Sequence, residues 1–547
     1  KHLICLTVLA CLATASNAET ITVCPDGACD HVDIQDAIDS ASDGDLVMVG
    51  PGTYGPINLL GKSLSIVGDG DPENVILDGG GTSRVVNASQ VSAGAVSISN
   101  LSIRNGYIFS NGSSAGAGIE CSGTDLNLDN IVLEACRLER NSSGYHDTRG
   151  AGIHGAPTNL VITNSMVRNN DIELINTGSL YSRAGGYGGG ISVLGGSLEI
   201  RNTRIEGNSV QTSTTGGSWH DNHAMGGGVF VQDAALKVTD SVVANNLCTV
   251  ENQSSSVATC HPRGGGVMAT GHGEKFFSNV QIIGNRIVGR SSTTYDSQNY
   301  NSTIGGGMIV GGPVVSILGC LVESNIVEGG LDRPGRNAGG GIWFDGYQGK
   351  NGNCDLLIEN TIVRENFSGV EESLGDRIAS GIGFQGLFSS ITVRNTSLSS
   401  VVQLAYSMLH NWNVDPSLFA MEDVFICGST SPLGGSFNEE GLDVEYACSD
   451  CNGDGLTDSD QIISGELEDL NDNGTPDCCE VGGDCGPCPE SPWDLNQDGM
   501  IDSGDMGLLL GFWGECMSAG CPGDFNLDGK VSGTDLGLIL GYWGPCE

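Results

Sequence analysis

Basic residues are scarce in this sequence. Its 547 residues include 23 Lys and Arg against 66 Asp and Glu, which gives a formal net charge of -43 at pH 7. Nucleic acid and anionic membrane surfaces are bound by clustered Lys and Arg, so the charge argues against both kinds of partner. Calcium is the natural counterion for such a chain, although a solvated acidic surface also keeps an exported protein soluble in a salty habitat.

Long apolar runs are missing after the first residues. Beyond residues 3–12, no stretch reaches the roughly 18 apolar residues that a membrane helix needs. Residues 3–12 follow Lys1 and precede small residues at 16–18, which predicts a signal peptide over residues 1–18 and a mature chain from Glu19. A lipoprotein signal that uses Cys11 is the alternative. Both interpretations predict a secreted protein, either extracellular or associated with the cell surface.

Aromatic residues are few, at 5% of the chain, whereas 85 residues are glycine and 20 are cysteine. Two of the 20 cysteines, Cys5 and Cys11, fall in the signal peptide and leave 18, an even number that favours disulfides over free thiols. Nine of them lie in residues 448–546, a density typical of a region too small to form a sufficient core. Cys136 and Cys320 occupy equivalent repeat positions, where we expect packed or disulfide-bonded side chains rather than catalytic ones.

A glycine-rich step into an apolar residue recurs along the chain at intervals of 34 to 41 residues. A short alternating strand follows each step, and then an Asn-x-x-apolar-x-x-Asn unit, as in residues 202–208 and 279–285. Such a period predicts a solenoid whose coils bury their inward residues by stacking on their neighbours. Gly and Asn suit the corners, where Asn side chains can stack into a hydrogen-bonded ladder. The steps begin at Gly116, Gly150, Gly188, Gly226, Gly264, Gly305 and Gly339.

The start of the repeat region has the pattern of a helical cap. Ile34, Ala37, Ile38 and Ala41 share one face of a short predicted helix, which would cover the first coil. A β-propeller is the rival architecture, but each blade needs four strands and each repeat here offers two or three short ones. We therefore expect an all-β solenoid with a helical cap.

Residues 34–70 resemble the cap and first coils of pectin-lyase-like proteins, and the glycine and asparagine repeats resemble those of exported and polymorphic surface proteins. The resemblance covers roughly residues 20–425. It implies a right-handed parallel β-helix, and its members include lyases, hydrolases, esterases and adhesins. The fold is therefore predicted more specifically than the activity.

Catalytic motifs of that family are mostly absent. The Gly271-His272-Gly273 segment is similar to the histidine element of polygalacturonases, but the aspartate elements expected on preceding coils are missing. Arg333 and Arg336 belong to a segment similar to the arginine segment of pectate lyases, without identifiable calcium-binding aspartates beside it. A turn and a loop are the simpler interpretations of the two segments.

Most of the extra length in each repeat lies between the Asn corner and the next glycine step, so we expect loops along one side of the solenoid. Aromatic rings beside polar groups in such loops suit an extended saccharide. The candidate substrate-binding residues are Tyr145, Arg149, Trp219, Arg263, Arg333 and Arg336. The candidate catalytic residues are His220, Asp221, His223 and His272, of which the first three could hold a transition metal or supply an acid–base pair. An exposed polar loop is the alternative interpretation of residues 219–223.

Two loops near the C-terminus have the spacing of calcium ligands. Side-chain oxygens at loop positions 1, 3, 5, 9 and 12 and a carbonyl at position 7 surround the ion, and glycine at position 6 permits the turn. The predicted ligands are Asp494, Asn496, Asp498, Met500, Asp502 and Asp505, then Asp524, Asn526, Asp528, Lys530, Ser532 and Asp535. We expect Ile501 and Val531, both at position 8, to pair the two loops through a β bridge, and the following helices to pack together.

Two further acidic loops precede this pair and are less complete. Their candidate ligands are Asp450, Asn452, Asp454 and Asp458, then Asp469, Asn471, Asn473, Asp477 and Glu480. Glu480 stands at position 12 of its loop, whereas the first loop has Gln461 there. A thrombospondin-like acidic linker is the alternative description of this stretch.

The duplicated loop and helix of residues 491–547 resemble dockerin type I modules, which tie polysaccharide-degrading enzymes to cohesin scaffolds. Ser503-Gly504 and Gly533-Thr534 depart from the cellulosomal pattern, as do the added cysteines, which leaves the cohesin-like or other surface-anchoring partner open. We thus divide the chain into a signal peptide at 1–18, a capped β-helix at 19–425, an acidic linker at 426–490 and a dockerin-like module at 491–547.

The sequence therefore predicts a secreted calcium-binding β-helix protein that binds or degrades extracellular polysaccharide. If it is an enzyme, it is expected to be a polysaccharide lyase or a glycoside hydrolase. A non-enzymatic cell-surface or adhesin-like protein is the alternative.

Overall fold

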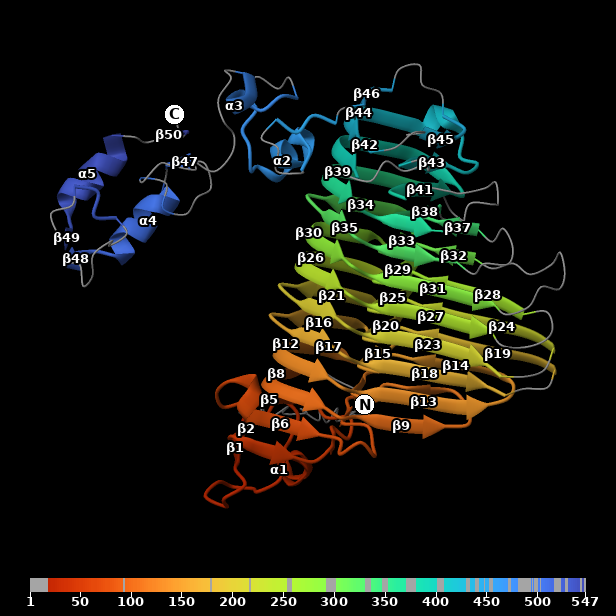
Figure 1. The fold of residues 1–547 in the computed structure, drawn as a ribbon. Helices are drawn as coiled ribbons and strands as arrows, with labels where there is room; N and C mark the ends of the chain where they lie inside the picture. Colours follow the sequence, from red (N-terminus) through yellow and green to blue (C-terminus); the bar gives the residue numbers. More distant parts are fainter. Residues whose placement is uncertain are drawn as a thin grey trace, which may run out of the picture. The chain divides into compact units, whose positions relative to one another are not determined.

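The computed structural model describes most of the chain and divides it into two compact units, unit 1 with residues 1–261 and 291–298 and unit 2 with residues 262–290 and 299–547. Each unit contains coils of a parallel β-solenoid (Figure 1). The described residues are 18–91, 94–177, 180–215, 218–252, 258–291, 302–329, 336–346, 353–369, 380–400, 408–428, 433–437, 442–446, 448–451, 456–470, 474–480, 493, 495, 500–501, 503–515, 523–526, 530–541 and 544–545. The predicted signal peptide lies almost entirely outside them.

Four sheets make up unit 1. Sheet I contains β1 (Thr20–Val23), β2 (Leu46–Val49), β3 (Gly52–Tyr54), β5 (Ser65–Gly68), β6 (Val75–Asp78), β8 (Ala95–Arg104), β12 (Asp125–Glu134), β16 (Asn159–Thr163), β17 (Met166–Arg168), β21 (Ser197–Arg201), β22 (Arg204–Glu206) and β26 (Ala235–Ala244). Sheet II contains β4 (Ile57–Asn58), β7 (Val86–Asn87), β11 (Ile119–Glu120), β15 (Ile153–Gly155), β20 (Ile191–Leu194) and β25 (Val229–Gln232). Sheet III contains β9 (Tyr107–Ser110), β13 (Arg137–Ser142), β18 (Asp171–Asn176), β23 (Ser209–Thr214) and β27 (Leu247–Asn252). Sheet IV contains β10 (Ser114–Ala115), β14 (Tyr145–Arg149), β19 (Leu180–Tyr187), β24 (Ser218–Met225) and the first residues of β28 (Ala258–Arg263).

Alternating residues fill the interior of unit 1, as the repeat pattern predicts. In sheet I, Leu160 pairs in register with Leu198, and Leu198 with Leu236. All three side chains are buried, while Glu199 beside them is turned to the surface side of the strand. Identical apolar positions thus stack from coil to coil, which confirms the parallel β-solenoid.

The N-terminal cap is a short helix, α1 (Ile34–Ser40). Asp33 caps it, because its carboxylate accepts a hydrogen bond from the backbone N–H of Gln35. Ile34, Ala37 and Ile38 are fully buried, and Ala41 nearly so, which confirms the predicted apolar face.

Buried asparagines form a ladder at one corner of unit 1. Asn170, Asn208 and Asn246 end successive Asn-x-x-apolar-x-x-Asn units, and each is fully buried. Asn170 Nδ2 donates to Asn208 Oδ1 at 2.9 Å, and Asn208 Nδ2 donates to Asn246 Oδ1 at 3.0 Å. The first residue of each unit takes a left-handed backbone, with φ of 51° at Asn164 and 44° at Asn202. The predicted ladder is therefore confirmed.

The solenoid of unit 2 repeats this construction. Its strands are β29 (Val267–Thr270), β30 (Lys275–Ile283), β31 (Arg286–Ser291), β32 (Ser302–Ile304), β33 (Met308–Val310), β34 (Val314–Leu318), β35 (Leu321–Glu323), β36 (Ile326–Glu328), β37 (Arg336–Ala338), β38 (Ile342–Asp345), β39 (Cys354–Arg364), β40 (Phe367–Gly369), β41 (Ile382–Gln385), β42 (Phe388–Ser399), β43 (Leu409–Asn411), β44 (Phe419–Ile426), β45 (Leu433–Gly435) and β46 (Val444–Glu445). Asn285, Asn325 and Asn366 form a second ladder, with side-chain hydrogen bonds of 3.0 and 2.9 Å. The last parallel pairing joins Val424 to Val444.

A short helix, α2 (Asp458–Ser464), contacts the solenoid strands of unit 2. The buried carboxylate of Asp460 accepts a 2.7 Å hydrogen bond from the Ser399 hydroxyl of β42. Arg364 Nη1 lies 3.9 Å from the same carboxylate, and the hydroxyls of Ser459 and Ser397 are 3.3 Å apart. These contacts hold α2 against strands β39 and β42.

The C-terminal repeats have a small core of their own. Helices α4 (Ser503–Gly511) and α5 (Gly533–Gly541) contribute Leu509 and Ile539, which are buried with Ile501 and Val531. The predicted β bridge between Ile501 and Val531 is wrong, since Ile501 pairs with Gly544 and Val531 with Gly514. The first loop thus pairs with the segment after α5, and the second loop pairs with the segment after α4. Two similar loop-helix units reach this arrangement when their helices pack against each other. The strands involved are β47 (Met500–Ile501), β48 (Gly514–Glu515), β49 (Lys530–Val531) and β50 (Gly544–Pro545).

The cysteines divide into two groups. Disulfides join Cys24 to Cys29, Cys427 to Cys448 and Cys451 to Cys479. The prediction of disulfides from the even number of cysteines is wrong for the solenoid, where the described cysteines are buried thiols that fill the core as small apolar groups. These thiols belong to Cys121, Cys136, Cys248, Cys260, Cys320 and Cys354. Cys136 and Cys320 are packed, which is one of the two outcomes predicted for them.

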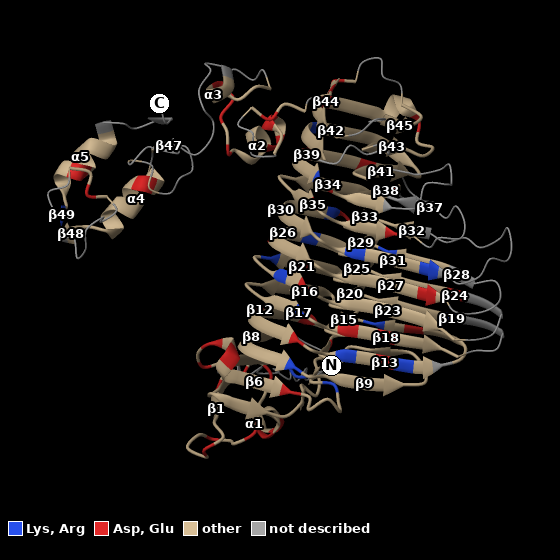
Figure 2. Cartoon of the chain, in the orientation of Figure 1, with Lys and Arg blue, Asp and Glu red and all other residues tan. Residues whose placement is uncertain are grey.

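No helix in the described part of the chain is long and apolar enough to cross a membrane. Red segments mark acidic residues in helices α2, α4 and α5 (Figure 2).

Candidate functional site

The segments expected to be loops on one side of the solenoid are strands in unit 1. Arg149 of β14 pairs in register with Tyr187 of β19, and Arg183 of β19 pairs with Asp221 of β24. Extra residues between the Asn corner and the glycine step therefore form sheet IV rather than free loops. The reason is that each segment finds the backbone hydrogen-bond partners it needs on the neighbouring coil.

The side chains of sheet IV alternate between the interior and the surface. Ala184 of β19 and Asn222 of β24 pair in register and are fully buried, as is Thr148 of β14. Their neighbours Asp147 and Arg183 face the other way and are about one-third exposed. The outward face of sheet IV is consequently built from charged, aromatic and imidazole side chains on a rigid backbone.

Arg149 and Tyr187 form the centre of this outward face. The Arg149 guanidinium carbon lies 4.2 Å from the centroid of the Tyr187 ring, in cation–π geometry. Arg149 Nη2 also donates to Asp147 Oδ2 at 2.9 Å. Arg183 donates to the Tyr187 hydroxyl, and its Nε lies 4.0 Å from Asp147 Oδ1. Phe230 of β25 lies beside Tyr187, with the two ring centroids 4.9 Å apart, and the Arg149 guanidinium carbon is 5.7 Å from the Phe230 centroid.

The surroundings of Tyr187 and Arg183 raise the pKa values of both side chains. Burial and the Asp147 carboxylate raise the pKa of Tyr187, so its hydroxyl stays protonated at neutral pH. Burial alone would lower the pKa of Arg183, but Tyr187, Asp147 and Asp221 raise it above its usual value. Arg183 is therefore cationic at neutral pH.

Two guanidinium nitrogens on this face have no hydrogen-bond acceptor among the described residues. They are Nη1 of Arg149 and Nε of Arg183, and both atoms are buried. Buried donors in folded proteins nearly always have a partner. The two arginines are on adjacent strands, and both guanidinium groups lie close to the Asp147 carboxylate.

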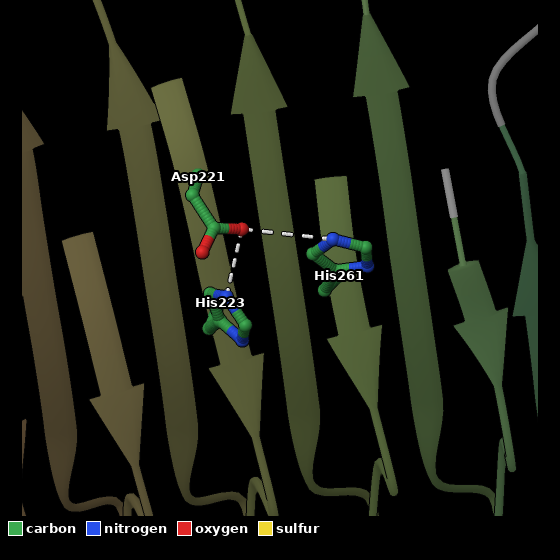
Figure 3. A group of neighbouring side chains, drawn as sticks. All are labelled: Asp221, His223 and His261. Atoms are coloured by element: carbon green, nitrogen blue, oxygen red, sulfur yellow. Dashed lines mark ion pairs between the residues drawn. The ribbon is translucent and has the colours of Figure 1, made fainter. Parts of the chain in front are cut away.

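A second cluster lies on the neighbouring strands. Asp221 Oδ1 is 2.8 Å from His223 Nε2 and 3.6 Å from His261 Nε2, and the two imidazole rings are 5.0 Å apart (Figure 3). His261 was not among the predicted catalytic or metal-binding residues, although its position 38 residues after His223 corresponds to one repeat. The repeat period is thus the signal that could have identified it.

The remaining predicted site residues lie elsewhere in the structure or outside its described part. Tyr145 is exposed on β14. Arg263 belongs to unit 2. Burial raises the pKa of Asp345, and the positive charge of Arg263 partly offsets this rise. His272 is exposed in the turn between β29 and β30, and its carbonyl accepts a 3.1 Å hydrogen bond from Lys275. Outside the described residues are Arg333 and the side chains of Trp219, His220 and Arg336.

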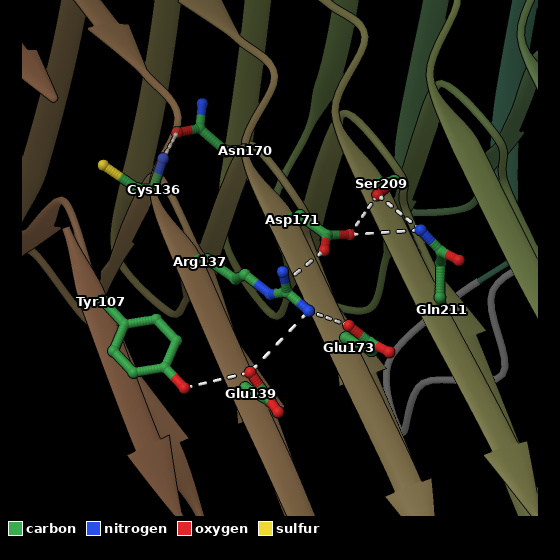
Figure 4. A network of polar contacts seen from close by, with 9 residues as sticks. All are labelled: Tyr107, Cys136, Arg137, Glu139, Asn170, Asp171, Glu173, Ser209 and Gln211. Atoms are coloured by element: carbon green, nitrogen blue, oxygen red, sulfur yellow. Dashed lines mark hydrogen bonds and ion pairs between the residues drawn. The ribbon is translucent and has the colours of Figure 1, made fainter. Parts of the chain in front are cut away.

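Sheet III shows a different outward face, on which charges pair with one another. Arg137 contacts Glu139, Asp171 and Glu173, and the Tyr107 hydroxyl donates to Glu139 at 3.0 Å (Figure 4). Arg137 is also nearly half exposed. This network is a solvated ion-pair ladder and offers no buried donor comparable to those of Arg149 and Arg183.

The predicted calcium loops are described in part. Asp505 and Asp535, at position 12 of the two terminal loops, are fully buried. Asp505 accepts a hydrogen bond from the backbone N–H of Leu495 at 2.7 Å, and Asp535 accepts from those of Phe525 at 2.9 Å and Ser532 at 2.9 Å. Asp524, Asn526, Lys530 and Ser532 are described, as is the backbone of Met500, while Asp494, Asn496, Asp498, Asp502 and Asp528 lie outside the described residues. Buried carboxylates at the closing position, tied to the backbone of their own loops, fit an oxygen-liganded cation.

The two earlier loops are less completely described. Asp458 is buried in α2 and accepts a 2.9 Å hydrogen bond from the backbone N–H of Cys451. Asp469 accepts from Gly474 at 2.7 Å, and Asp477, at the start of α3 (Asp477–Glu480), accepts from Leu470 at 3.2 Å. Asp450 is exposed. Asn452, Asp454, Asn471, Asn473 and the side chain of Glu480 lie outside the described residues.

Comparisons with known proteins give solved structures of low similarity. No family model matches the chain. No curated protein matches it either. A mannuronic acid specific polysaccharide family 6 lyase from human gut microbiota is similar at 12% identity, with 78% of this chain and 91% of that chain covered and a TM-score of 0.30. The A-module of a mannuronan C-5 epimerase from Azotobacter vinelandii is similar at 12% identity, with coverages of 75% and 92% and a TM-score of 0.25.

Proposed function

We propose that this protein is extracellular and binds an acidic polysaccharide on the outward face of sheet IV. The observation that carries the proposal is the pair of buried guanidinium donors, Arg149 Nη1 and Arg183 Nε, beside the ring of Tyr187. The disulfides among the described residues favour an oxidising compartment, which is where such polymers are found.

The chemistry of the face matches a chain of acidic sugars. A planar guanidinium binds carboxylate or sulfate groups through two parallel hydrogen bonds, which an ammonium group cannot do. Tyr187 and Phe230 offer aromatic surface for the apolar face of a sugar ring. Parallel strands about 4.8 Å apart present these groups in a row, so a polymer running across the strands meets several of them.

The net charge of -43 makes this local arrangement decisive. A polyanion is repelled by most of the surface and approaches where cations are concentrated. Binding of an acidic polymer should therefore depend steeply on a few arginines and weaken with salt, because salt screens exposed charges within about 10 Å at 0.1 M.

A binding array with pectic, alginate and sulfated glycans tests the proposal at low and high salt. Arg149→Ala and Arg183→Gln should each weaken binding about tenfold or more, since a hydrogen bond to a charged group contributes about 1.5–3 kcal/mol. Arg137→Ala, which alters the self-paired face of sheet III, should leave binding unchanged. Circular dichroism of each variant confirms that it is folded.

The same incubations distinguish binding from degradation. New reducing ends indicate a glycoside hydrolase, and unsaturated products indicate a polysaccharide lyase. If no glycan binds, or if Arg137→Ala weakens binding as much as Arg149→Ala, the proposal fails. A non-enzymatic surface or adhesin-like protein is then the better description.

We propose in addition that the terminal loop-helix repeats bind calcium. Asp505 and Asp535 support this proposal, because both are buried at the closing position of loops whose other predicted ligands are oxygen donors. When bound, calcium would be held by the carboxylates and carbonyls of each loop and would neutralise their mutual repulsion. A docking role with a cohesin-like partner stays a prediction of the dockerin resemblance.

Calcium binding is tested by titration with calcium and with a chelator. We expect tight calcium binding to the whole protein and a lower unfolding temperature of the C-terminal repeats in chelator. Asp535→Asn should reduce the calcium stoichiometry, whereas Asp415→Asn, at an exposed turn of the solenoid, should not. An unchanged stoichiometry in Asp535→Asn would contradict the assignment.

A further inference from the structure

The geometry points to a transition-metal site on sheet IV, formed by Asp221, His223 and His261, and we propose that its ion is zinc. Its three ligands differ from those of the predicted calcium loops and from the residues of the Arg149–Tyr187 group, although Asp221 pairs in register with Arg183. Its three residues come from strand β24 and from the following coil, so only the stacking of coils brings them together (Figure 3).

The distances within the cluster suit a single small cation. In a tetrahedral zinc site with bonds of about 2.0–2.1 Å, neighbouring ligand atoms are about 3.3 Å apart. Asp221 Oδ1 is 2.8 Å from one histidine Nε2 and 3.6 Å from the other, and the three ligand atoms all lie within 4.8 Å of one another. The two distances from the carboxylate oxygen to the imidazole nitrogens are thus within about 0.5 Å of the tetrahedral value.

His223 gives an independent indication of a ligand. Both of its ring nitrogens are buried, and neither makes a hydrogen bond to any residue in the described part of the chain. The 2.8 Å contact with Asp221 is close, but its direction is not that of a hydrogen bond. A buried imidazole normally has a hydrogen-bond partner or a metal on at least one nitrogen, so the contact is better explained by two ligands that converge on one ion.

The ligand set selects the metal. Two imidazole nitrogens and one carboxylate oxygen suit zinc and other first-row divalent ions, whereas calcium requires six or more oxygen ligands. Three protein ligands also leave a fourth position, as in zinc sites that bind water or a substrate oxygen. That position faces the surface, because the Asp221 side chain is 46% exposed while each histidine is only 15% exposed.

Cobalt and zinc titrations of the full-length protein test the site. The buffer contains saturating calcium, which occupies oxygen-only sites and leaves a mixed nitrogen and oxygen site for the added metal. We expect one cobalt ion per chain with visible d–d bands, without the sulfur-to-cobalt charge-transfer bands that cysteine ligands produce. Zinc should displace the cobalt and abolish these bands.

Matched histidine variants assign the spectrum to the residues. His223→Ala and His261→Gln should each abolish the cobalt bands, while His272→Ala, at the exposed turn of unit 2, should retain them in full. Far-ultraviolet circular dichroism checks that both site variants are folded. An unfolded variant is replaced by Asp221→Asn, whose side chain is the most exposed of the three and which should weaken binding at least tenfold.

The proposal is overturned if wild-type protein shows no cobalt bands, if the bands include sulfur charge transfer, or if folded His223→Ala and His261→Gln retain them. Glycan binding by Arg149 variants is measured separately in chelator-free buffer without added zinc. Failure of the metal site therefore leaves the polysaccharide proposal unaffected, and the reverse also holds.

Discussion

Asn208 and Asn246, one coil apart, are joined by two hydrogen bonds to the same oxygen. Oδ1 of Asn246 accepts from the side-chain Nδ2 of Asn208 at 3.0 Å and from its backbone N–H at 3.0 Å. Asn208 Nδ2 also donates to the carbonyl of Val167 at 3.0 Å. The third glycine of the repeat makes room for this ladder, because a Cβ on Gly190 would lie 3.1 Å from the Asn208 side chain. The two repeated motifs of the sequence thus meet at one corner of the coil.

Replacing Asn208 with alanine should destabilise unit 1 strongly. The change removes the acceptor of Asn170 and leaves buried polar groups without partners, at a cost of about 2–4 kcal/mol. Thermal or denaturant unfolding measures the loss. Gln211→Ala, an exposed change on the next strand, is the control and should shift stability by about 0.5 kcal/mol or less. Equal effects of the two changes would contradict the structural role of the ladder.

Gly190→Ala should also destabilise the solenoid, because the new Cβ would lie 2.7 Å from the carbonyl oxygen of Gly228 on the next coil. Backbone atoms on both coils would have to shift, which costs about 1–3 kcal/mol. The same substitution at Gly537 is the matched control. Its Cβ would meet nothing within 4 Å on helix α5, so Gly537→Ala should stabilise that helix by about 0.5–1 kcal/mol. The prediction fails if both Gly190→Ala and Gly537→Ala lower the stability, or if neither does.

Acid should lower the free energy of unfolding of unit 1, partly because His154 becomes protonated. Burial, together with the nearby positive charge of Arg149, lowers the pKa of His154 to about 4 in the folded protein, against about 6.5 when unfolded. Between these pH values the unfolded chain binds the extra proton, so this contribution to stability is present above pH 6.5 and is lost as the pH falls toward 4. Its size is about 2–3 kcal/mol. In His154→Gln, the fall in unfolding temperature between pH 7 and 5 should be smaller than in wild type, and identical pH profiles would refute the prediction.

Ser399→Ala should loosen helix α2 from the solenoid strands of unit 2. The variant loses the 2.7 Å hydrogen bond to the buried Asp460 carboxylate, which contributes about 1.5–3 kcal/mol. Hydrogen exchange of residues 458–464 should accelerate while the strands keep their protection. Ser390→Ala is the control. Ser390 lies on β42, as Ser399 does, but its hydrogen bond to Asp355 is exposed. Unchanged exchange of α2 in Ser399→Ala would show that this bond does not hold the helix.

The solenoid thiols should resist labelling in the native protein. Burial raises the pKa of Cys136 to about 12 and that of Cys320 to about 11, so neither forms the reactive thiolate at neutral pH. Mass spectrometry after alkylation should find both unmodified until the protein is unfolded, when they react completely. Cys427 and Cys448 should react only after reduction, since they form a disulfide. Rapid native labelling of Cys136 would show that the core at this corner opens.

Much of the fold was predictable because its signals are local and repeated. The alternation of Leu198 and Ile200 indicated which residues face inward, and the apolar face of Ile34, Ala37 and Ile38 indicated the cap. Sheet IV was missed because its segments vary in length and lack a regular apolar alternation. Gly185 and Gly186, for example, weaken any strand prediction for β19, yet both form regular pairs with β24.

The sequence by itself determined the repeat, the glycine and asparagine corners and the acidic loops, because each follows from residue types at fixed spacing along the chain. Only the tertiary structure decided which residues meet across coils. Asp221 and His223 are neighbours in sequence, but His261 joins them through the register of stacked strands. That register is set by hydrogen bonds and side-chain packing between coils, and it depends on where each variable segment begins and ends.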